Sequence, residues 1–300
     1  MTGAPQHNAR LRHRSADGTW LNIQTYGDSD KPIVVLAHGW TCNTAFWAPV
    51  IERLVPDHYV VAYDQRGHGR SDVPVNRERY STKALADDLE AVLGLCVQDR
   101  RAVLVGHSMG GMTIMAAGGR TRVAERTAAV LLCSTGPADL VEQALVAPPK
   151  LPRAVRAFLT RSILTSRLPL GPITPVGKAV LKYAVMGRRA GSEQVQACAE
   201  IVHACATAPR ARWGRVLTGL DVRPGLTMIE APTSIVVGTA DKLTPPPHAR
   251  AMQRALRAAD GLVELPGVGH MAPLEDPDAV AAEIRRLVTT HLTVERTDAA

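Results

Sequence analysis

The segment AVLVGHSMGG, at residues 102–111, says most about the fold of this chain. Its first four residues form a short apolar run of the kind found in buried parallel strands. The next five, GHSMG at 106–110, have the spacing G-x-S-x-G, which is typical of a tight turn between a strand and a helix. Gly106 and Gly110 leave room where a neighbouring Cβ atom would collide. We expect the turn to lift Ser108 Oγ above the end of the strand.

Other parts of the chain repeat this alternation of strand and helix. Residues 19–26 alternate in the manner of an exposed strand. Continuous apolar runs predict buried strands at 33–37, 58–63, 102–106, 128–133, 235–238 and 261–265. Helical spacing of apolar residues predicts helices at 82–97, with Ser81 as N-cap, at 245–258 and at 277–290. This order predicts an α/β fold with a doubly wound, mostly parallel sheet.

The segment 136–226 breaks this pattern, because it contains no apolar run comparable to IVVLA at 33–37. It has helical stretches separated by proline and glycine, at 151–167, 176–187 and 192–206. We therefore expect a core made of residues 1–135 and 227–300. Residues 136–226 are expected to form a helical cap inserted over the carboxyl edge of the sheet.

A serine hydroxyl becomes a strong nucleophile when a base takes its proton and an acid orients that base. His270 lies in GVGHMAP, between the last predicted strand and the last predicted helix, and Asp241 directly follows another buried strand. Both loops should open at the sheet edge where Ser108 opens. The competing place for the acid is the loop after the strand at 128–133. That loop has no carboxylate before Asp139. We expect Ser108 as nucleophile, Asp241 as acid and His270 as base, with helix capping as the alternative role for Asp241.

A second loop at this edge, HGW at 38–40, follows the buried strand IVVLA. Two backbone amides can stabilise the oxyanion of a tetrahedral intermediate, and Trp40 and Met109 are the candidates. Trp40 is also a candidate wall of an acyl pocket. His38 is expected to hold its turn by hydrogen bonds, with a pocket wall as the alternative. His107 precedes the serine and belongs to the nucleophile turn.

Together these motifs resemble the α/β-hydrolase superfamily, in its serine esterase and lipase branch, over residues 17–290. They occur in order: HGW at 38–40, DQRGHGRSD at 64–72, GHSMGG at 106–111, and the late loops with Asp241 and His270. The resemblance implies an eight-stranded sheet, a helical cap and hydrolysis without a cofactor or metal ion. It also implies that the polar side chains of the second motif are structural, namely Asp64, Arg66, His68 and Asp72.

The activity that this resemblance implies is hydrolysis of carboxylic esters through an acyl-serine, with lipid-like esters or thioesters as subclasses. Cofactor-free haloperoxidases or perhydrolases and carbon–carbon bond hydrolases use the same triad and stay open. A non-catalytic receptor is disfavoured because such proteins usually lack a triad member. Dehalogenases and epoxide hydrolases carry an aspartate nucleophile where this chain has Ser108. Tyr183 is the residue that could correspond to a lid tyrosine of the epoxide hydrolases.

The composition limits the class of protein and the cellular compartment that we expect. The 300 residues are 46% hydrophobic and 21% charged, which is typical of a globular protein and excludes a disordered or coiled-coil chain. Five cysteines without a CxxC pair make a disulfide framework or a zinc site unexpected and favour a reducing compartment. We see no signal peptide and no apolar stretch that could span a membrane, and expect a cytoplasmic location.

The positive charge is concentrated in the predicted cap. The formal net charge is +7, and residues 137–215 hold twelve Lys and Arg against four Asp and Glu. The segment LPRAVRAFLTRSILTSRLPL mixes cations with apolar residues, which suggests contact with anionic lipid or acidic acyl carriers. The alternative is a solvated cap face above an apolar pocket. Nucleic acid is disfavoured because no recognition motif occurs, and the oligomeric state is left open.

Overall fold

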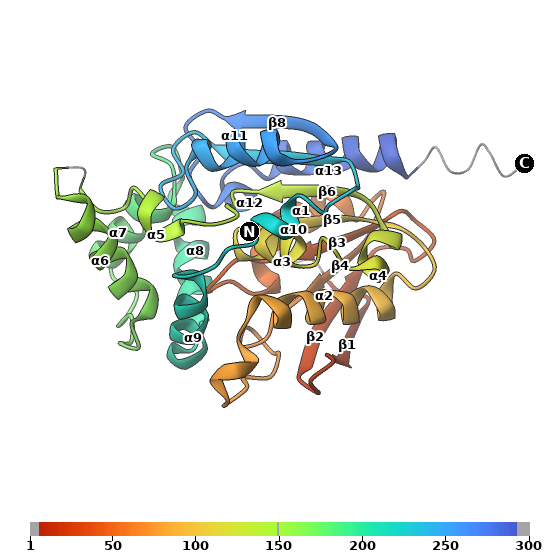
Figure 1. The fold of residues 1–300 in the computed structure, drawn as a ribbon, viewed down its shortest axis with the longest axis horizontal. Coiled ribbons are helices and arrows are strands. Elements are labelled where there is room, and N and C mark those ends of the chain that lie inside the picture. Colours follow the sequence, from red (N-terminus) through yellow and green to blue (C-terminus); the bar gives the residue numbers. More distant parts are fainter. Residues whose placement is uncertain (1–5, 149, 293–300) are drawn as a thin grey trace, which may run out of the picture.

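The apolar runs of the sequence become the inner strands of one eight-stranded sheet with helices on both faces (Figure 1). The structure, a computed structural model, describes residues 6–148 and 150–292. The strands are β1 Ala9–Arg14, β2 Trp20–Tyr26, β3 Ile33–Ala37, β4 Tyr59–Tyr63, β5 Ala102–His107, β6 Thr127–Cys133, β7 Thr233–Gly238 and β8 Ala259–Leu265.

The sheet has the order β1-β2-β4-β3-β5-β6-β7-β8. The pairs β1/β2 and β2/β4 are antiparallel, and all pairs from β4 to β8 are parallel. The doubly wound, mostly parallel sheet expected from the sequence is therefore confirmed. Because β3, β5, β6, β7 and β8 run in the same direction, the loops after them open at one edge.

The helices connect these strands and cover both faces of the sheet. They are α1 Ala48–Leu54, α2 Thr82–Cys96, α3 Met109–Ala116, α4 Thr121–Glu125, α5 Leu140–Gln143, α6 Arg153–Thr165, α7 Pro175–Val185, α8 Ser192–Ala204, α9 Thr207–Leu217, α10 Arg223–Leu226, α11 Pro246–Ala255, α12 Ala272–Glu275 and α13 Pro277–His291, with short 3-10 helices η1 Thr44–Trp47 and η2 Arg77–Arg79. Ser81 caps α2 as expected, since its side chain accepts a hydrogen bond from Ala84 N.

Two hydrophobic cores form because successive strand residues point to opposite faces of the sheet. In β3, Ile33 and Val35 contribute to the core under α2, α3 and α11, whereas Val34 and Leu36 contribute to the core under α1 and α13. All five residues of β3 are buried. This burial on both faces explains why the inner strands read as continuous apolar runs.

The first two strands differ from the sequence prediction. Residues 19–26 were expected to be exposed, but β2 lies inside the sheet, and Leu21 and Ile23 have no accessible surface. The strand that shields its other edge, β1 with sequence ARLRHR, was not predicted. Its side chains are exposed or half-buried, so it carries no apolar run. Pairing with β2 makes it a strand, in keeping with the charged character of edge strands.

Between β6 and β7 the chain forms the helices α5 to α10, and most of them gather at one end of the sheet (Figure 1, left). The helices α6, α7 and α8 match the three predicted stretches closely, but α9 was not predicted. Trp213 of α9 is fully buried. Gly225 of α10 lies against α3, because a Cβ atom there would be 1.9 Å from Met115 O. The last part of this segment thus packs on the sheet layer.

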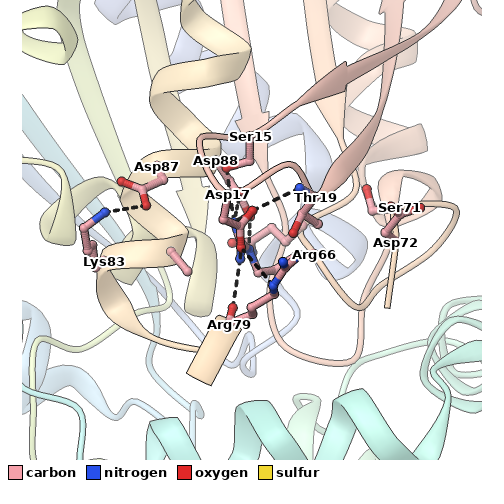
Figure 2. A network of polar contacts seen from close by, with 12 residues as sticks. Ser15, Asp17, Thr19, Arg66, Ser71, Asp72, Arg79, Lys83, Asp87 and Asp88 are labelled. Atoms are coloured by element: carbon pink, nitrogen blue, oxygen red, sulfur yellow. Dashed lines mark hydrogen bonds and ion pairs between the residues drawn. The ribbon is translucent and has the colours of Figure 1, made fainter. Parts of the chain in front are cut away.

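A buried arginine holds the loop after β4 in place (Figure 2). Arg66 has no accessible surface, and its guanidinium donates to Asp88 of α2 at 2.7 and 2.5 Å and to Asp17 Oδ2 at 2.7 Å. It also donates to Ser15 Oγ and to Arg79 O. Partial burial would raise the pKa of Asp17, but the hydrogen bonds from Arg66 and Thr19 lower it to about 2. Arg66 therefore joins the β1–β2 loop to α2.

Candidate active site

Ser108 lies at the sharp turn between β5 and α3. Its backbone has φ 51° and ψ −117°, a conformation that side-chain-bearing residues rarely adopt. A Cβ atom on Gly106 would lie 2.5 Å from the carbonyl carbon of Gly110, and one on Gly110 would lie 2.0 Å from Ala37 O. The Ser108 amide donates to Cys133 O at 3.0 Å. Glycine is required on both sides of the serine, and backbone packing holds the strained turn.

Asp241 and His270, from the loops after β7 and β8, are brought together. His270 Nδ1 donates to Asp241 Oδ2 at 2.9 Å and lies 3.1 Å from Oδ1, and both residues are buried. Asp241 also accepts hydrogen bonds from Leu243 N and Thr244 N, each at 2.9 Å, and from Thr244 Oγ1 at 3.0 Å. The carboxylate therefore holds the 241–244 turn and orients the imidazole at the same time. Helix capping, the alternative considered for Asp241, does not occur, since the N-cap of α11 is Pro245 and no side chain caps that helix.

The loops of Ser108 and His270 are adjacent. The ring of His107 lies 5.0 Å from that of His270, and His107 Nε2 donates to the carbonyl oxygen of His270 at 2.8 Å. In the described part of the chain, neither Ser108 Oγ nor His270 Nε2 has a hydrogen-bond partner. Catalytic hydrogen bonds are often long without substrate and tighten when it binds. The tautomer with the proton on Nδ1 leaves Nε2 free to accept one.

The HGW loop lies directly beside Ser108. A Cβ atom on Gly39 would be 3.1 Å from Ser108 Cβ. Within residues 6–148 and 150–292, the backbone amides of Trp40 and Met109 donate no hydrogen bond. Buried amides are rarely left unpaired in folded proteins. Two such donors next to a strained serine are suited to bind an anionic oxygen.

A family model described as the alpha/beta hydrolase family matches residues 34–283. This chain belongs to the alpha/beta hydrolase family. It is a member of a family of hydrolases, as the order of its motifs had suggested.

Individual relatives of this hydrolase are distant. The protein named "Probable oxidoreductase EphD" of Mycobacterium tuberculosis is 24% identical over 94% of this chain and 49% of its own length, so the chain spans about half of it. The 3-oxoadipate enol-lactonase 2 of Acinetobacter baylyi is 26% identical, over 88% of this chain and 91% of that protein. A solved thermophilic esterase from Thermogutta terrifontis has a TM-score of 0.74 at 23% identity, covering 94% and 98% of the two chains. At this level of identity, the similarity to the esterase shows a shared fold only.

The buried histidines near the site of this hydrolase hold backbone turns. His38 Nε2 accepts from Gln65 N at 3.0 Å, and its Nδ1 donates to Gly39 O at 2.7 Å. Burial lowers the pKa of His38 to about 4 and that of His68 to about 3. Both rings are therefore neutral at neutral pH. His38 has no accessible surface with which to line a pocket, whereas Trp40 is half-buried.

The helical segment between β6 and β7, the predicted cap, touches the His270 loop through the backbone. His270 N donates to Val185 O at 2.9 Å, at the end of α7. The carboxylate of Glu275 accepts hydrogen bonds from the amides of Gly187, Gly269 and Met271 at 2.7 to 3.2 Å. Burial raises the pKa of Glu275, although these amides oppose the shift. One glutamate thus joins the end of α7 to the loop that carries His270.

Two further contacts join the cap segment to the loops of the site. Trp40 Nε1 donates to Arg210 O of α9 at 2.9 Å. The ammonium of Lys242, next to Asp241, lies 3.4 Å from the ring centroid of Tyr183 and donates to Tyr183 O at 2.6 Å. Tyr183 is 54% exposed, and its ring face is occupied by the lysine.

Sequence reasoning missed Glu275, Val185 and Arg210, which position the site residues from other elements. Their contacts are made by backbone atoms or by a carboxylate outside any motif, so the sequence carried only a weak signal for them.

In the described part of the chain, no cluster of three or more His, Cys, Asp or Glu is arranged to hold a metal ion. No described helix is long and apolar enough to cross a membrane.

Proposed function

We propose that this hydrolase cleaves carboxylic esters through an acyl intermediate on Ser108. The observation that carries the proposal is the Asp241–His270 pair, whose Nδ1 is fixed at 2.9 Å from the carboxylate while Nε2 is left without a partner. The base is thus held in the tautomer that can accept a proton from a serine. The strained backbone of Ser108 and the unpaired amides of Trp40 and Met109 support the same chemistry.

In this mechanism His270 Nε2 takes the proton of Ser108 Oγ as the oxygen attacks the ester carbonyl. Asp241 stabilises the imidazolium that forms, and the amides of Trp40 and Met109 bind the oxyanion. Collapse expels the alcohol, which takes the proton from His270. Water, activated by His270, then attacks the acyl-Ser108 ester and releases the acid.

A cyclic ester is the second candidate substrate. The similarity to an enol-lactonase over 88% of the chain and 91% of that relative favours it. Opening a lactone uses the same attack on a carbonyl, but the alcohol stays attached to the acyl group. The two substrate classes therefore share the triad and differ in the pocket.

The test uses p-nitrophenyl esters from acetyl to palmitoyl, simple lactones and a fluorophosphonate probe. We expect ester hydrolysis and labelling, both lowered by several orders of magnitude in Ser108→Ala. The matched control is Ser134→Ala, because Ser134 is a fully buried serine at the end of the neighbouring strand and should leave both signals unchanged. Hydrolysis that survives in Ser108→Ala, or a wild-type protein that the probe does not label, contradicts the proposal. Turnover of lactones alone selects the second candidate.

A further inference from the structure

The stretch from 143 to 192 is unusual in its charge. It contains no Asp or Glu, yet it holds nine cations: Lys150, Arg153, Arg156, Arg161, Arg167, Lys178, Lys182, Arg188 and Arg189. Among the described residues several of these cations have no carboxylate partner, and Arg153, Arg161, Arg167 and Arg188 are exposed. These nine positive charges exceed the net charge of +7 of the whole chain, so the rest of the molecule carries a net charge of −2.

The same stretch exposes an unusual amount of apolar surface. Neither α6 nor α7 has a buried residue. In α6, Phe158 is 67% and Ile163 is 62% exposed; in α7, Val176 is 74% and Val180 is 62% exposed. Leu168, in the connection between the two helices, is 75% exposed. Large exposed apolar patches mark interaction sites in folded proteins.

These side chains follow helical spacing, so each helix presents an apolar stripe to solvent. Phe158 lies three residues after Val155 in α6, and Val180 lies four residues after Val176 in α7. Both helices lie at the cap end of the molecule, opposite the C-terminal end of α13 (Figure 1). We call the exposed residues Val155, Phe158, Ile163, Leu168, Val176 and Val180, with Arg153, Arg161 and Arg167, the cap surface.

We propose that the cap surface docks on an anionic lipid bilayer. Apolar side chains flanked by cations suit the boundary between acyl chains and negative headgroups, where each part of the surface meets its complement. A second copy of this chain fits poorly, because two surfaces without a carboxylate would repel each other. A nucleic acid would neutralise the cations but leave the apolar side chains without a partner.

The contacts of the cap support a surface that stays folded when it docks. A Cβ atom on Gly214 of α9 would lie 1.8 Å from Leu164 O, so the backbones of α6 and α9 are in direct contact. The end of α7 is tied to the loops of Asp241 and His270 through Tyr183 and Val185. The inner sides of these helices are therefore occupied, and their outer sides are free to bind.

The experiment is flotation of the full chain with vesicles of phosphatidylcholine alone or mixed with phosphatidylglycerol, at low and high salt. We expect binding to the mixed vesicles only, and we expect salt to weaken that binding.

The triple variant R153Q/R161Q/R167Q should bind the mixed vesicles about a hundredfold more weakly, at about fivefold per cation. F158S/I163S/V176S should bind more weakly by at least about tenfold. Ser108→Ala should bind like wild type, which separates docking from ester chemistry.

The control R70Q/R77Q/R254Q removes the same charge from exposed arginines outside the cap and should bind like wild type. Thermal unfolding checks that every variant is folded. Equal binding to neutral vesicles, no binding to either kind, or an equal loss in the control would overturn the proposal. So would self-association or binding to single-stranded RNA that the cap variants abolish while vesicle binding is absent.

Discussion

His38 illustrates how burial decides the state of one side chain. A histidine next to the Ser108 loop could be read as a base, but both of its ring nitrogens are bonded to the backbone, Nδ1 to Gly39 O of its own turn and Nε2 to Gln65 N of the loop after β4. Burial lowers its pKa from 6.5 to about 4, so it stays neutral where His270 has to work. The difference between the two histidines is therefore their surroundings: His270 has a carboxylate on one nitrogen and no partner on the other.

We predict that acid destabilises the fold through His38. The unfolded chain binds a proton at this group near pH 6.5, but the folded protein only near pH 4. The stability it contributes is complete above about 6.5 and is lost as the pH falls toward 4. Urea unfolding at pH 7 and pH 5 should give a lower free energy of unfolding at pH 5. His38→Gln keeps an acceptor and should reduce the difference, and an unchanged difference would contradict the assignment.

At the scale of elements, the short helix α12 links the end of α7 to the loop that carries His270. Its last residue, Glu275, binds amides from the cap and from the His270 loop. We predict that Glu275→Gln lowers kcat for ester hydrolysis roughly ten- to a hundredfold with little change in KM, because the loop carrying His270 shifts. Steady-state kinetics on a soluble ester measure this. Glu200→Gln, on the exposed side of α8, should keep wild-type values, and a Glu275→Gln enzyme of full activity would refute the link.

The contact between α6 and α9 leads to a second prediction. Gly214→Ala would place a methyl group 1.8 Å from Leu164 O, so the two helices must separate. We expect limited proteolysis to cut α6 several times faster, with the sheet remaining folded. Gly94→Ala in α2 is the matched control, because a Cβ atom there meets nothing within 4 Å. That change should raise stability by about 0.5–1 kcal/mol; unaltered proteolysis of Gly214→Ala would contradict the contact.

For the whole molecule, Arg66 is a junction of distant segments. Its guanidinium reaches the β1–β2 loop and α2, and its carbonyl oxygen accepts from Trp213 Nε1 of α9 at 2.8 Å. We predict that Arg66→Ala lowers the free energy of unfolding by about 3–5 kcal/mol, because Asp88 is left buried without its cation. Urea denaturation measures the change. Arg70→Ala, at an exposed neighbour, should cost less than about 0.5 kcal/mol, and equal losses would disprove the junction.

The sequence alone determined the parts whose cause is local. Hydrophobic periodicity predicts the buried strands. Backbone sterics within a few residues explain the glycines around Ser108, and a local hydrogen bond explains Ser81 as the N-cap of α2. It also placed Asp241 and His270 at one sheet edge, since parallel strands end together. Only the tertiary structure decided what depends on partners far along the chain. The polar strand β1 exists because β2 pairs with it, Trp213 makes α9 part of the core, and Glu275 acquires its role from amides of two loops. Packing likewise decided that the apolar stripes of α6 and α7 are exposed. The periodicity of the sequence predicts an apolar face on each helix, but it does not predict what covers that face.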